Sequence, residues 1–152
     1  MDGNGRWAKK IGKKRVFGHK NGTKSVNDCI SGAIEIGVKQ ITLYVFSIEN
    51  WKRPKLEVNA LMKLLLNSLE KELPSLIKND IKLCTIGDLN SLNNKSKEKL
   101  KEVIFKTSKN KKLILTLAIS YGSRQELTNT IKIISDKVKN NIISQENIDE
   151  NI

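Results

Sequence analysis

The sequence of 152 residues has the length of one domain, and its hydrophobic content of 38% suffices for a single core of that size. Its net charge of +12 would suggest a nucleic-acid-binding protein, but 24 of the 28 basic residues are lysines and only four are arginines, which disfavours a patch selected for phosphate and base contacts. No apolar run approaches the roughly 20 residues of a membrane-spanning helix, and no signal-peptide pattern begins the sequence. We therefore expect a cytoplasmic protein that binds no nucleic acid.

Periodicity predicts helices and strands that alternate along the chain. Apolar residues at helical spacing, with Gly37 as a stop, predict a helix over residues 20–37. The further predicted elements are strands over 41–46, 81–88 and 112–120, and helices over 57–79, 95–109 and 123–140. This alternation predicts an α/β fold, in which a parallel β-sheet is flanked by helices on both faces, within a single domain covering residues 1–152.

The predicted sheet is incomplete at its beginning. Residues 1–20 contain no strand pattern, although a loop as rich in chemistry as DGNGR is expected to follow a strand in an open α/β sheet. We therefore expect the sequence to begin just after a first strand, with Met1 as its last residue or as an internal methionine. The final stretch, NIDENI, resembles the start of another helix.

The two cysteines, Cys29 and Cys84, lie far apart and do not have the spacing of a metal site. Each stands in an apolar stretch, so we expect both to be buried free thiols.

The stretch DGNGRW combines the residue types of a magnesium–diphosphate site. Asp2 offers a hard oxygen ligand suited to Mg²⁺. Gly3 and Gly5 allow backbone N–H groups to turn toward an anion, and Arg6 offers a planar fork for phosphate oxygens. The alternative is an ordinary turn, since DG and NG are common turn dipeptides.

A second candidate stretch is RVFGHKNG. Arg15 and His19 are one helical turn apart and face the same pocket if this segment begins a helix. The N-terminus of such a helix would also attract phosphate. The alternative for the histidine is a surface or capping role.

The third stretch, FSIENWKRP, follows the predicted strand 41–46, where an α/β sheet places its active-site loop. Its polar and aromatic side chains are Ser47, Glu49, Asn50, Trp51 and Arg53. A capped strand–helix connection is the alternative, but so many specific residues favour a functional loop. Of the later turns, we interpret GDL at 87–89 as structural, whereas Arg124 in SYGSRQEL could border the site.

In this order, the stretches MDGNGRWA, R..FGH..G, TLYVFS.ENWKRP..EV..LM, IGD and YG.R.EL closely resemble the cis-prenyltransferases, and among them the bacterial undecaprenyl diphosphate synthases, also called isoprenyl transferases. The resemblance covers nearly the whole sequence. It implies a transferase that condenses isopentenyl diphosphate with an allylic diphosphate such as farnesyl diphosphate, giving a cis-polyprenyl diphosphate, a lipid-carrier precursor for cell-wall synthesis. It also implies a Mg²⁺ requirement, a homodimer, a hydrophobic tunnel for the product and peripheral contact with the inner face of the membrane.

The resemblance also implies roles for individual residues. Asp2 corresponds to the catalytic, magnesium-binding aspartate, and Asn50 to a position assigned the role of proton acceptor. The residues matching substrate contacts are Gly3, Asn4, Gly5, Arg6, Trp7, Arg15, His19, Ser47, Ile48, Glu49, Trp51 and Arg53. Because a neutral carboxamide is a very poor base, we expect Asn50 to orient a substrate while diphosphate or a nearby ionised group takes the proton. We expect Val58, Leu61, Met62, Leu65 and Leu69 to line the tunnel or to belong to the core.

The sequence departs from the family pattern in three places. It has no strand before MDGN, it has no segment resembling RTSGE.R.SNFLLWQ with the glutamate that follows as a second metal ligand, and it has Ser120 and Ser123 where the family commonly has Asn and Gly. We therefore expect a truncated cis-prenyltransferase domain that carries the allylic half of the site. The alternatives are a non-catalytic partner subunit of the same fold, or an inactive fragment.

Overall fold

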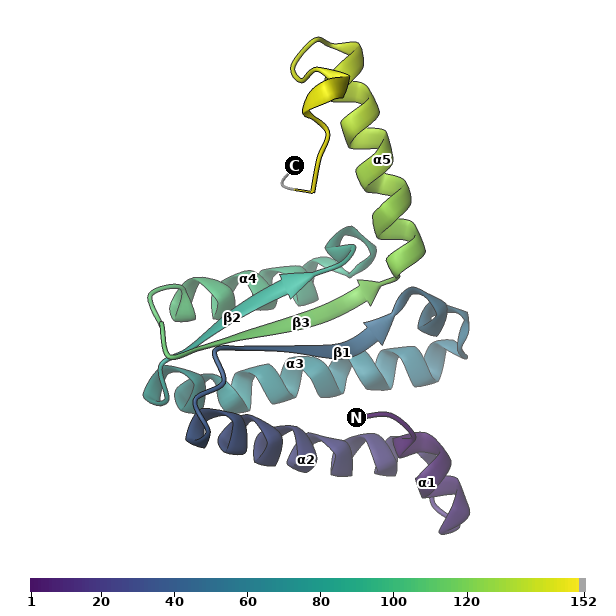
Figure 1. Cartoon of the computed structure of the whole chain (residues 1–152). Coiled ribbons are helices and arrows are strands. Elements are labelled where there is room, and N and C mark those ends of the chain that lie inside the picture. The colour runs from purple at the N-terminus through teal and green to yellow at the C-terminus, as the bar shows by residue number, and fades with distance from the viewer. Residues whose placement is uncertain (151–152) are drawn as a thin grey trace.

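The computed structural model describes residues 1–150, which form one three-stranded sheet and five helices (Figure 1). In chain order the elements are α1 (Asn4–Lys10), α2 (Arg15–Glu35), β1 (Gln40–Ser47), α3 (Lys55–Lys78), β2 (Ile81–Ile86), α4 (Asn94–Thr107), β3 (Leu113–Tyr121) and α5 (Ser123–Lys139). Short 3₁₀ turns cover Ile48–Lys52, Leu89–Ser91 and Gln145–Asn147. None of the helices in this described range is both long and apolar enough to cross a membrane.

All seven elements predicted from the sequence are present. The largest shift is in α2, which begins at Arg15 instead of residue 20 because its first turns pack through glycines and lack an apolar periodicity. Gly37 has a φ of 79° just after α2, so this glycine ends the helix as predicted.

Two expectations at the chain ends are wrong. The loop expected at DGNGR becomes helix α1 from Asn4 onward, although Gly5 and Asn4 are poor helix formers. Packing against α2 overrides that propensity. Near the other end, the start of a helix expected in NIDENI is absent up to Glu150, and residues 151 and 152 lie outside the described range.

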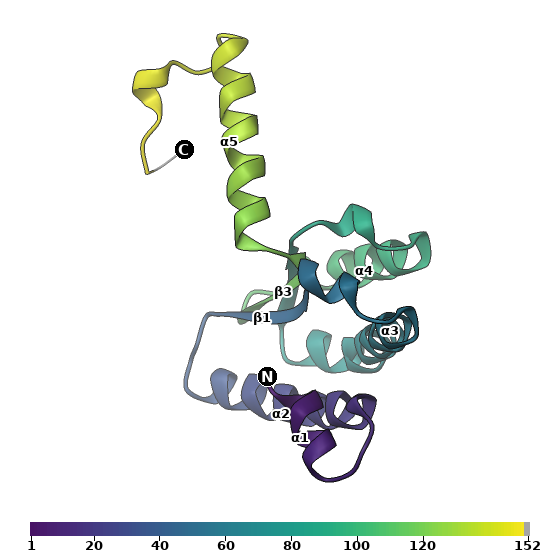
Figure 2. The ribbon, with the colours of Figure 1, turned by 90° about the vertical axis from the view of Figure 1, so that its right-hand side faces the viewer.

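The sheet is parallel and has the strand order β1-β3-β2, as expected for an α/β fold. Helices α2, α3 and α4 lie on one side of it. In Figure 2, α2 and α3 lie below the strands and α4 lies to their right. The expectation of helices packed on both faces is met on this side only. On the other side α5 extends away from the sheet and has no buried residue, and Tyr44 of β1 is 78% exposed (Figures 1 and 2).

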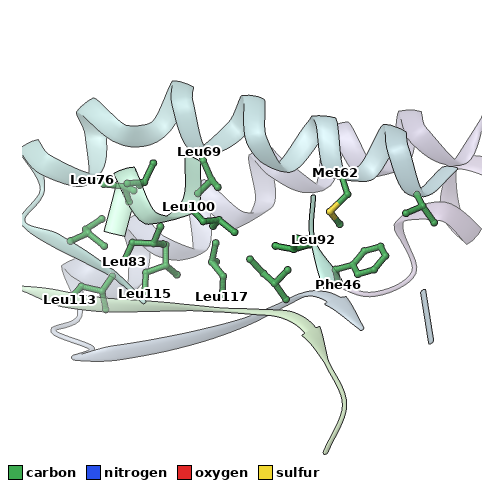
Figure 3. Packing of buried hydrophobic residues seen from close by; sticks show 14 residues of the cluster. Phe46, Met62, Leu69, Leu76, Leu83, Leu92, Leu100, Leu113, Leu115 and Leu117 are labelled. Carbon is green, nitrogen blue, oxygen red and sulfur yellow. The ribbon is translucent and has the colours of Figure 1, made fainter. Parts of the chain in front are cut away.

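The core lies between the sheet and helices α3 and α4 (Figure 3). Alternate residues of the central strand β3 point into it, as expected for a strand with one covered face. The side chains that meet in the core include Leu113, Leu115 and Leu117 of β3, Leu83 of β2, Leu69 and Leu76 of α3 and Leu100 of α4. Both cysteines are free, but only Cys84 is partly buried. The expectation of a buried Cys29 is wrong, because it lies on an exposed part of α2.

Helix α1 crosses α2 at two glycines. A Cβ atom added at Gly18 would lie 2.0 Å from the backbone oxygen of Asn4, and one added at Gly22 would lie 2.5 Å from the Nδ2 atom of Asn4. The Nδ2 group of Asn4 also donates a hydrogen bond to the carbonyl oxygen of Met1. This close approach therefore positions the whole N-terminal segment on α2.

We expect Gly18→Ala to displace α1, because a methyl group cannot occupy the space of a backbone carbonyl. The predicted loss of stability is about 1–3 kcal/mol, typical of overpacking, measured by chemical denaturation. The matched control is Gly32→Ala in the same helix, where a Cβ meets nothing within 4 Å. That change is expected to raise stability by about 0.5–1 kcal/mol through helix propensity. Equal stabilisation by both substitutions would contradict the close crossing.

Candidate active site

A cavity of about 780 Å³ lies between α2, α3 and the sheet. One end is polar, and the residues that we call its mouth come from the N-terminal segment, the start of α2 and the loop after β1. The mouth residues are Asp2, Gly3, Asn4, Gly5, Arg6, Arg15, His19, Ser47, Asn50 and Arg53. The body of the cavity is apolar and includes Leu43, Phe46, Leu115 and Leu117 of the sheet. The site therefore opens at the carboxyl end of β1, where an α/β sheet places its ligands.

The structure gathers most of the residues predicted from the sequence at this mouth. Four predicted residues do not line the cavity: Trp7, Ile48, Glu49 and Trp51. Arg124 is exposed at the start of α5 and does not line the cavity either. The GDL turn is structural as predicted, since Gly87 has a φ of 102° and Asp88 accepts a hydrogen bond from the N–H group of Asn90.

Asp2 and Arg6 form an exposed ion pair at the edge of the mouth. The Arg6 Nη2 to Asp2 Oδ2 distance is 2.8 Å, and the two side chains are 72% and 95% exposed. A hydrogen bond from the Gly3 N–H group, and then the charge of Arg6, lower the pKa of Asp2. Gly3 has a φ of 79°, a conformation that glycine adopts without strain. This carboxylate is ionised at neutral pH and open to solvent.

Two arginines from different elements meet at one carboxylate. Glu57, in the first turn of α3, places its Oε1 atom 3.3 Å from Arg15 Nε and 3.2 Å from Arg53 Nη1. The Glu57 side chain is only 18% exposed. The contact with Arg15 lacks hydrogen-bond geometry, so the Nε group of Arg15 is buried without a partner. A Cβ added at Gly5 would lie 2.9 Å from that Nε atom, so the backbone of α1 closes over the guanidinium group.

His19 lies on α2 one turn after Arg15, and both residues line the cavity as predicted. Its Nε2 atom is buried and has no hydrogen-bond partner. Burial, and then the charge of Arg53, lower the pKa of His19. The imidazole is therefore neutral at neutral pH, and an unsatisfied polar group faces the cavity beside two guanidinium groups.

The loop after β1 is held by its own polar side chains. Asn50 Oδ1 accepts a hydrogen bond of 3.3 Å from the Ser47 N–H group, which closes the 3₁₀ turn. Trp51 packs edge-on against Phe46, with ring centroids 4.8 Å apart, and its Nε1 group donates a hydrogen bond to Ser120 Oγ at 2.9 Å. In this structure Trp51 anchors the loop to the core.

Trp7 and Glu49 lie on the outside of the same region. Trp7 stacks on Phe17 with ring centroids 5.9 Å apart and is 46% exposed. Hydrogen bonds from its own backbone N–H group, and then from the Ser47 hydroxyl, lower the pKa of Glu49. Glu49 is thus an ionised acid at the surface of the loop.

The described residues contain no group of three or more His, Cys, Asp or Glu side chains that could hold a metal ion by themselves. Asp2 is the single carboxylate at the outer edge of the mouth, beside the N–H group of Gly3. Mg²⁺ is commonly bound by one or two carboxylates together with phosphate oxygens. The donor set therefore fits a magnesium ion held jointly by Asp2 and a bound diphosphate.

Four of the five apolar residues predicted for the tunnel line the cavity: Leu61, Met62, Leu65 and Leu69. Val58 belongs to the core instead, and Met62 and Leu69 belong to both. The far end of the cavity is polar again. There Asn27 of α2 donates a 3.1 Å hydrogen bond to Glu72 of α3, which links the two helices that line the cavity.

Three residues that build the site are not among the predicted site residues. Glu57 enters only as the first residue of the predicted helix 57–79, although an acid four residues after the rare Arg53 has the spacing of a helical ion pair. The i, i+4 glycines Gly18 and Gly22 indicated a close helix crossing, because small residues at that spacing let helices approach.

Comparisons with known proteins agree with this architecture. The model of the undecaprenyl diphosphate synthase family matches residues 1–152. An isoprenyl transferase from Chlorobaculum tepidum is 45% identical over 152 residues, which are 100% of this chain and 57% of that protein. A ditrans,polycis-undecaprenyl-diphosphate synthase described as (2E,6E)-farnesyl-diphosphate specific, from Pasteurella multocida, is 41% identical over 152 residues, which are 100% of this chain and 63% of that protein.

Among solved structures, lavandulyl diphosphate synthase from Lavandula x intermedia, in complex with dimethylallyl diphosphate, superposes with a TM-score of 0.94 at 30% identity. The superposition covers 99% of this chain and 64% of that chain. The chain thus spans 57–63% of the length of the two sequence relatives. The match of the family model over all its residues, with the parallel sheet and the helices around it, shows that the chain belongs to the undecaprenyl diphosphate synthase family of cis-prenyltransferases.

Proposed function

We propose that the protein transfers a prenyl group, condensing isopentenyl diphosphate with an allylic diphosphate such as farnesyl diphosphate to give a cis-polyprenyl diphosphate. The observation that carries this proposal is a single cavity with a cationic mouth and an apolar body. A diphosphate ester with a hydrocarbon tail has the same division of polarity. Arginine forks suit phosphate oxygens, and an apolar wall suits the tail.

In the proposed reaction the allylic carbon–oxygen bond breaks and its electron pair leaves with the diphosphate. A carbon–carbon bond forms between the allylic carbon and the terminal alkene carbon (C4) of isopentenyl diphosphate, which leaves the positive charge on C3. Loss of a proton from C2 to the released diphosphate or a nearby ionised group then gives the new C2=C3 double bond. Negative charge develops on the leaving diphosphate, where Arg15 and Arg53 can oppose it. Leu61 and Leu65 keep water from the hydrocarbon.

We also propose that Mg²⁺ takes part, held by Asp2 and the diphosphate. A bound magnesium ion supplies charge neutralisation of the leaving group. The low pKa of Asp2 keeps the carboxylate ready to bind a cation at neutral pH. The ion pair with Arg6 is exposed, so its opening costs little.

The homodimer and the peripheral contact with the inner face of the membrane are further proposals. Helix α5 exposes Leu127 and Ile131, each more than 60% accessible, which supports an additional packing partner. An apolar product supports release toward a lipid surface. Light scattering of the purified chain, and flotation with anionic vesicles, would measure the two associations.

The first test is a prenyl-transfer assay with farnesyl diphosphate and labelled isopentenyl diphosphate, run with Mg²⁺ and with chelator. We expect labelled polyprenyl product with Mg²⁺ and none with chelator. Tight binding of farnesyl diphosphate without turnover would instead support the alternative of a non-catalytic partner subunit. Absence of both would contradict the proposed function.

Asp2→Ala is expected to lower turnover by about 10²-fold or more. The substitution removes the carboxylate that is proposed to hold Mg²⁺, and with it the positive charge that neutralises the leaving diphosphate. The side chain is 95% exposed, so the free energy of unfolding should change by less than about 0.5 kcal/mol. Asp28→Ala, at an exposed position of α2, is the matched control and should leave turnover unchanged. Turnover of the Asp2 variant at the control's level would remove Asp2 from the mechanism.

Leu65→Trp is expected to fill the body of the cavity while leaving its mouth intact. Affinity for farnesyl diphosphate should fall about tenfold, whereas affinity for inorganic diphosphate should stay within about twofold of the unmodified chain. Calorimetry measures both. Leu56→Trp, at a position of α3 that is 85% exposed, serves as the control. An equal loss of both affinities would mean that the tail does not occupy this space.

A further inference from the structure

We propose that Glu57 is a positioning residue, which holds Arg15 of α2 and Arg53 of the β1–α3 connection together at the cavity mouth so that both guanidinium groups are in place before a diphosphate binds. This inference rests on the proposed function and adds a residue to the same site. Glu57 lies in the motif stretch ENWKRP..EV..LM, but the sequence alone assigns it no role in the site.

The Glu57 carboxylate contacts two arginines from different parts of the chain. One oxygen of Glu57 lies within 3.3 Å of both arginines, which belong to segments 38 positions apart in the sequence (53 − 15). Both arginines line the cavity, and the carboxylate contacts a single nitrogen of each, so the remaining N–H groups are left as donors for a ligand. Without the carboxylate, two like charges would repel each other and separate.

All three side chains are partly shielded from solvent. The Glu57 side chain is 18% exposed, and the Arg15 and Arg53 side chains are 36% and 30% exposed. Pairs that are partly shielded from water are screened less than surface pairs. Arg15 Nε is buried and makes only the ion-pair contact with Glu57, and His19 Nε2 is buried with no hydrogen-bond partner, so the hydrogen-bonding capacity beside the two arginines is not used up.

A carboxylate beside an anion site is otherwise unfavourable, because like charges repel each other. If Glu57 acted only through its charge, it would repel a diphosphate, and its neutralisation would tighten binding. If it positions the two arginines, its neutralisation weakens binding although the site becomes more positive. The direction of the change in affinity therefore separates positioning from a simple charge effect.

The decisive variant is Glu57→Gln, which keeps the shape and removes the charge. We expect it to weaken binding of inorganic diphosphate about fivefold in calorimetry. The matched control is Glu102→Gln. Glu102 likewise joins two cations, Lys99 and Lys106, but lies on α4 away from the mouth. The control should bind diphosphate like the unmodified chain. Equal or tighter binding by Glu57→Gln would overturn the proposal.

Nuclear magnetic resonance of the free protein provides a second readout that needs neither ligand nor turnover. The chain has four arginines and one histidine, so their side-chain signals are few. The groups facing His19 are Arg15, Arg53 and Glu57, and only Glu57 raises its pKa. Glu57→Gln should therefore lower the pKa of His19 further. It should also raise the rate at which the Arg15 and Arg53 Nε–H protons exchange with water, which weakens their signals. Unchanged arginine signals would overturn the positioning role.

These readouts distinguish two failures. If the unmodified chain does not bind diphosphate while Glu57→Gln still changes the Nε–H signals of Arg15 and Arg53, the proposed function fails and the positioning role remains. If the unmodified chain binds diphosphate and Glu57→Gln changes neither affinity nor signals, the positioning role fails alone. Glu57→Asp is the conservative variant, which keeps the charge on a shorter side chain. We expect the pKa of His19 to stay close to that of the unmodified chain, whereas the arginine signals should recover less fully.

Discussion

The parallel pairing of β3 with both neighbouring strands is the constraint on which the site depends. It brings the carboxyl ends of all three strands to one edge of the sheet, so the segments that follow them meet there. Ser120, near the end of β3, shows the consequence, because its hydroxyl joins Trp51 from the loop after β1 and Ser91 from the turn after β2. Three stretches far apart in sequence are thereby tied at one buried residue.

Ser120 also explains a departure from the family pattern. It is 2% exposed and has a φ of 51°, in the left-handed region where asparagine is more frequent than serine. Asparagine is the residue that the resembling family commonly carries at this position. Serine accepts some backbone strain here, and its hydroxyl retains the hydrogen bonds that hold the loop.

The cavity separates charge from hydrocarbon along its length. Asp2, three arginines and a neutral histidine lie at the mouth, and Glu57 contacts two of those arginines. Leucines of α3 and the sheet line the middle. Far from the mouth, the Asn27–Glu72 hydrogen bond joins α2 to α3. With 1.5 Å of rise per residue, the 15 positions from Glu57 to Glu72 place these two acids about 22 Å apart along α3 (72 − 57 = 15). An elongated ligand with one charged end matches this polarity in one orientation only.

Local patterns in the sequence determined the seven central helices and strands, the parallel sheet and the three chemical stretches, because hydrophobic period and rare residue types act over short distances. Tertiary structure alone decided that Asn4 and Gly5 are helical, since only the glycines of α2 let that segment pack. It also decided that Trp51 holds the loop while Glu57 joins Arg15 to Arg53. The Arg15–Glu57 and Trp51–Ser120 contacts join residues 42 and 69 positions apart (57 − 15 and 120 − 51). They depend on how helices and strands are stacked, and no local propensity encodes that stacking.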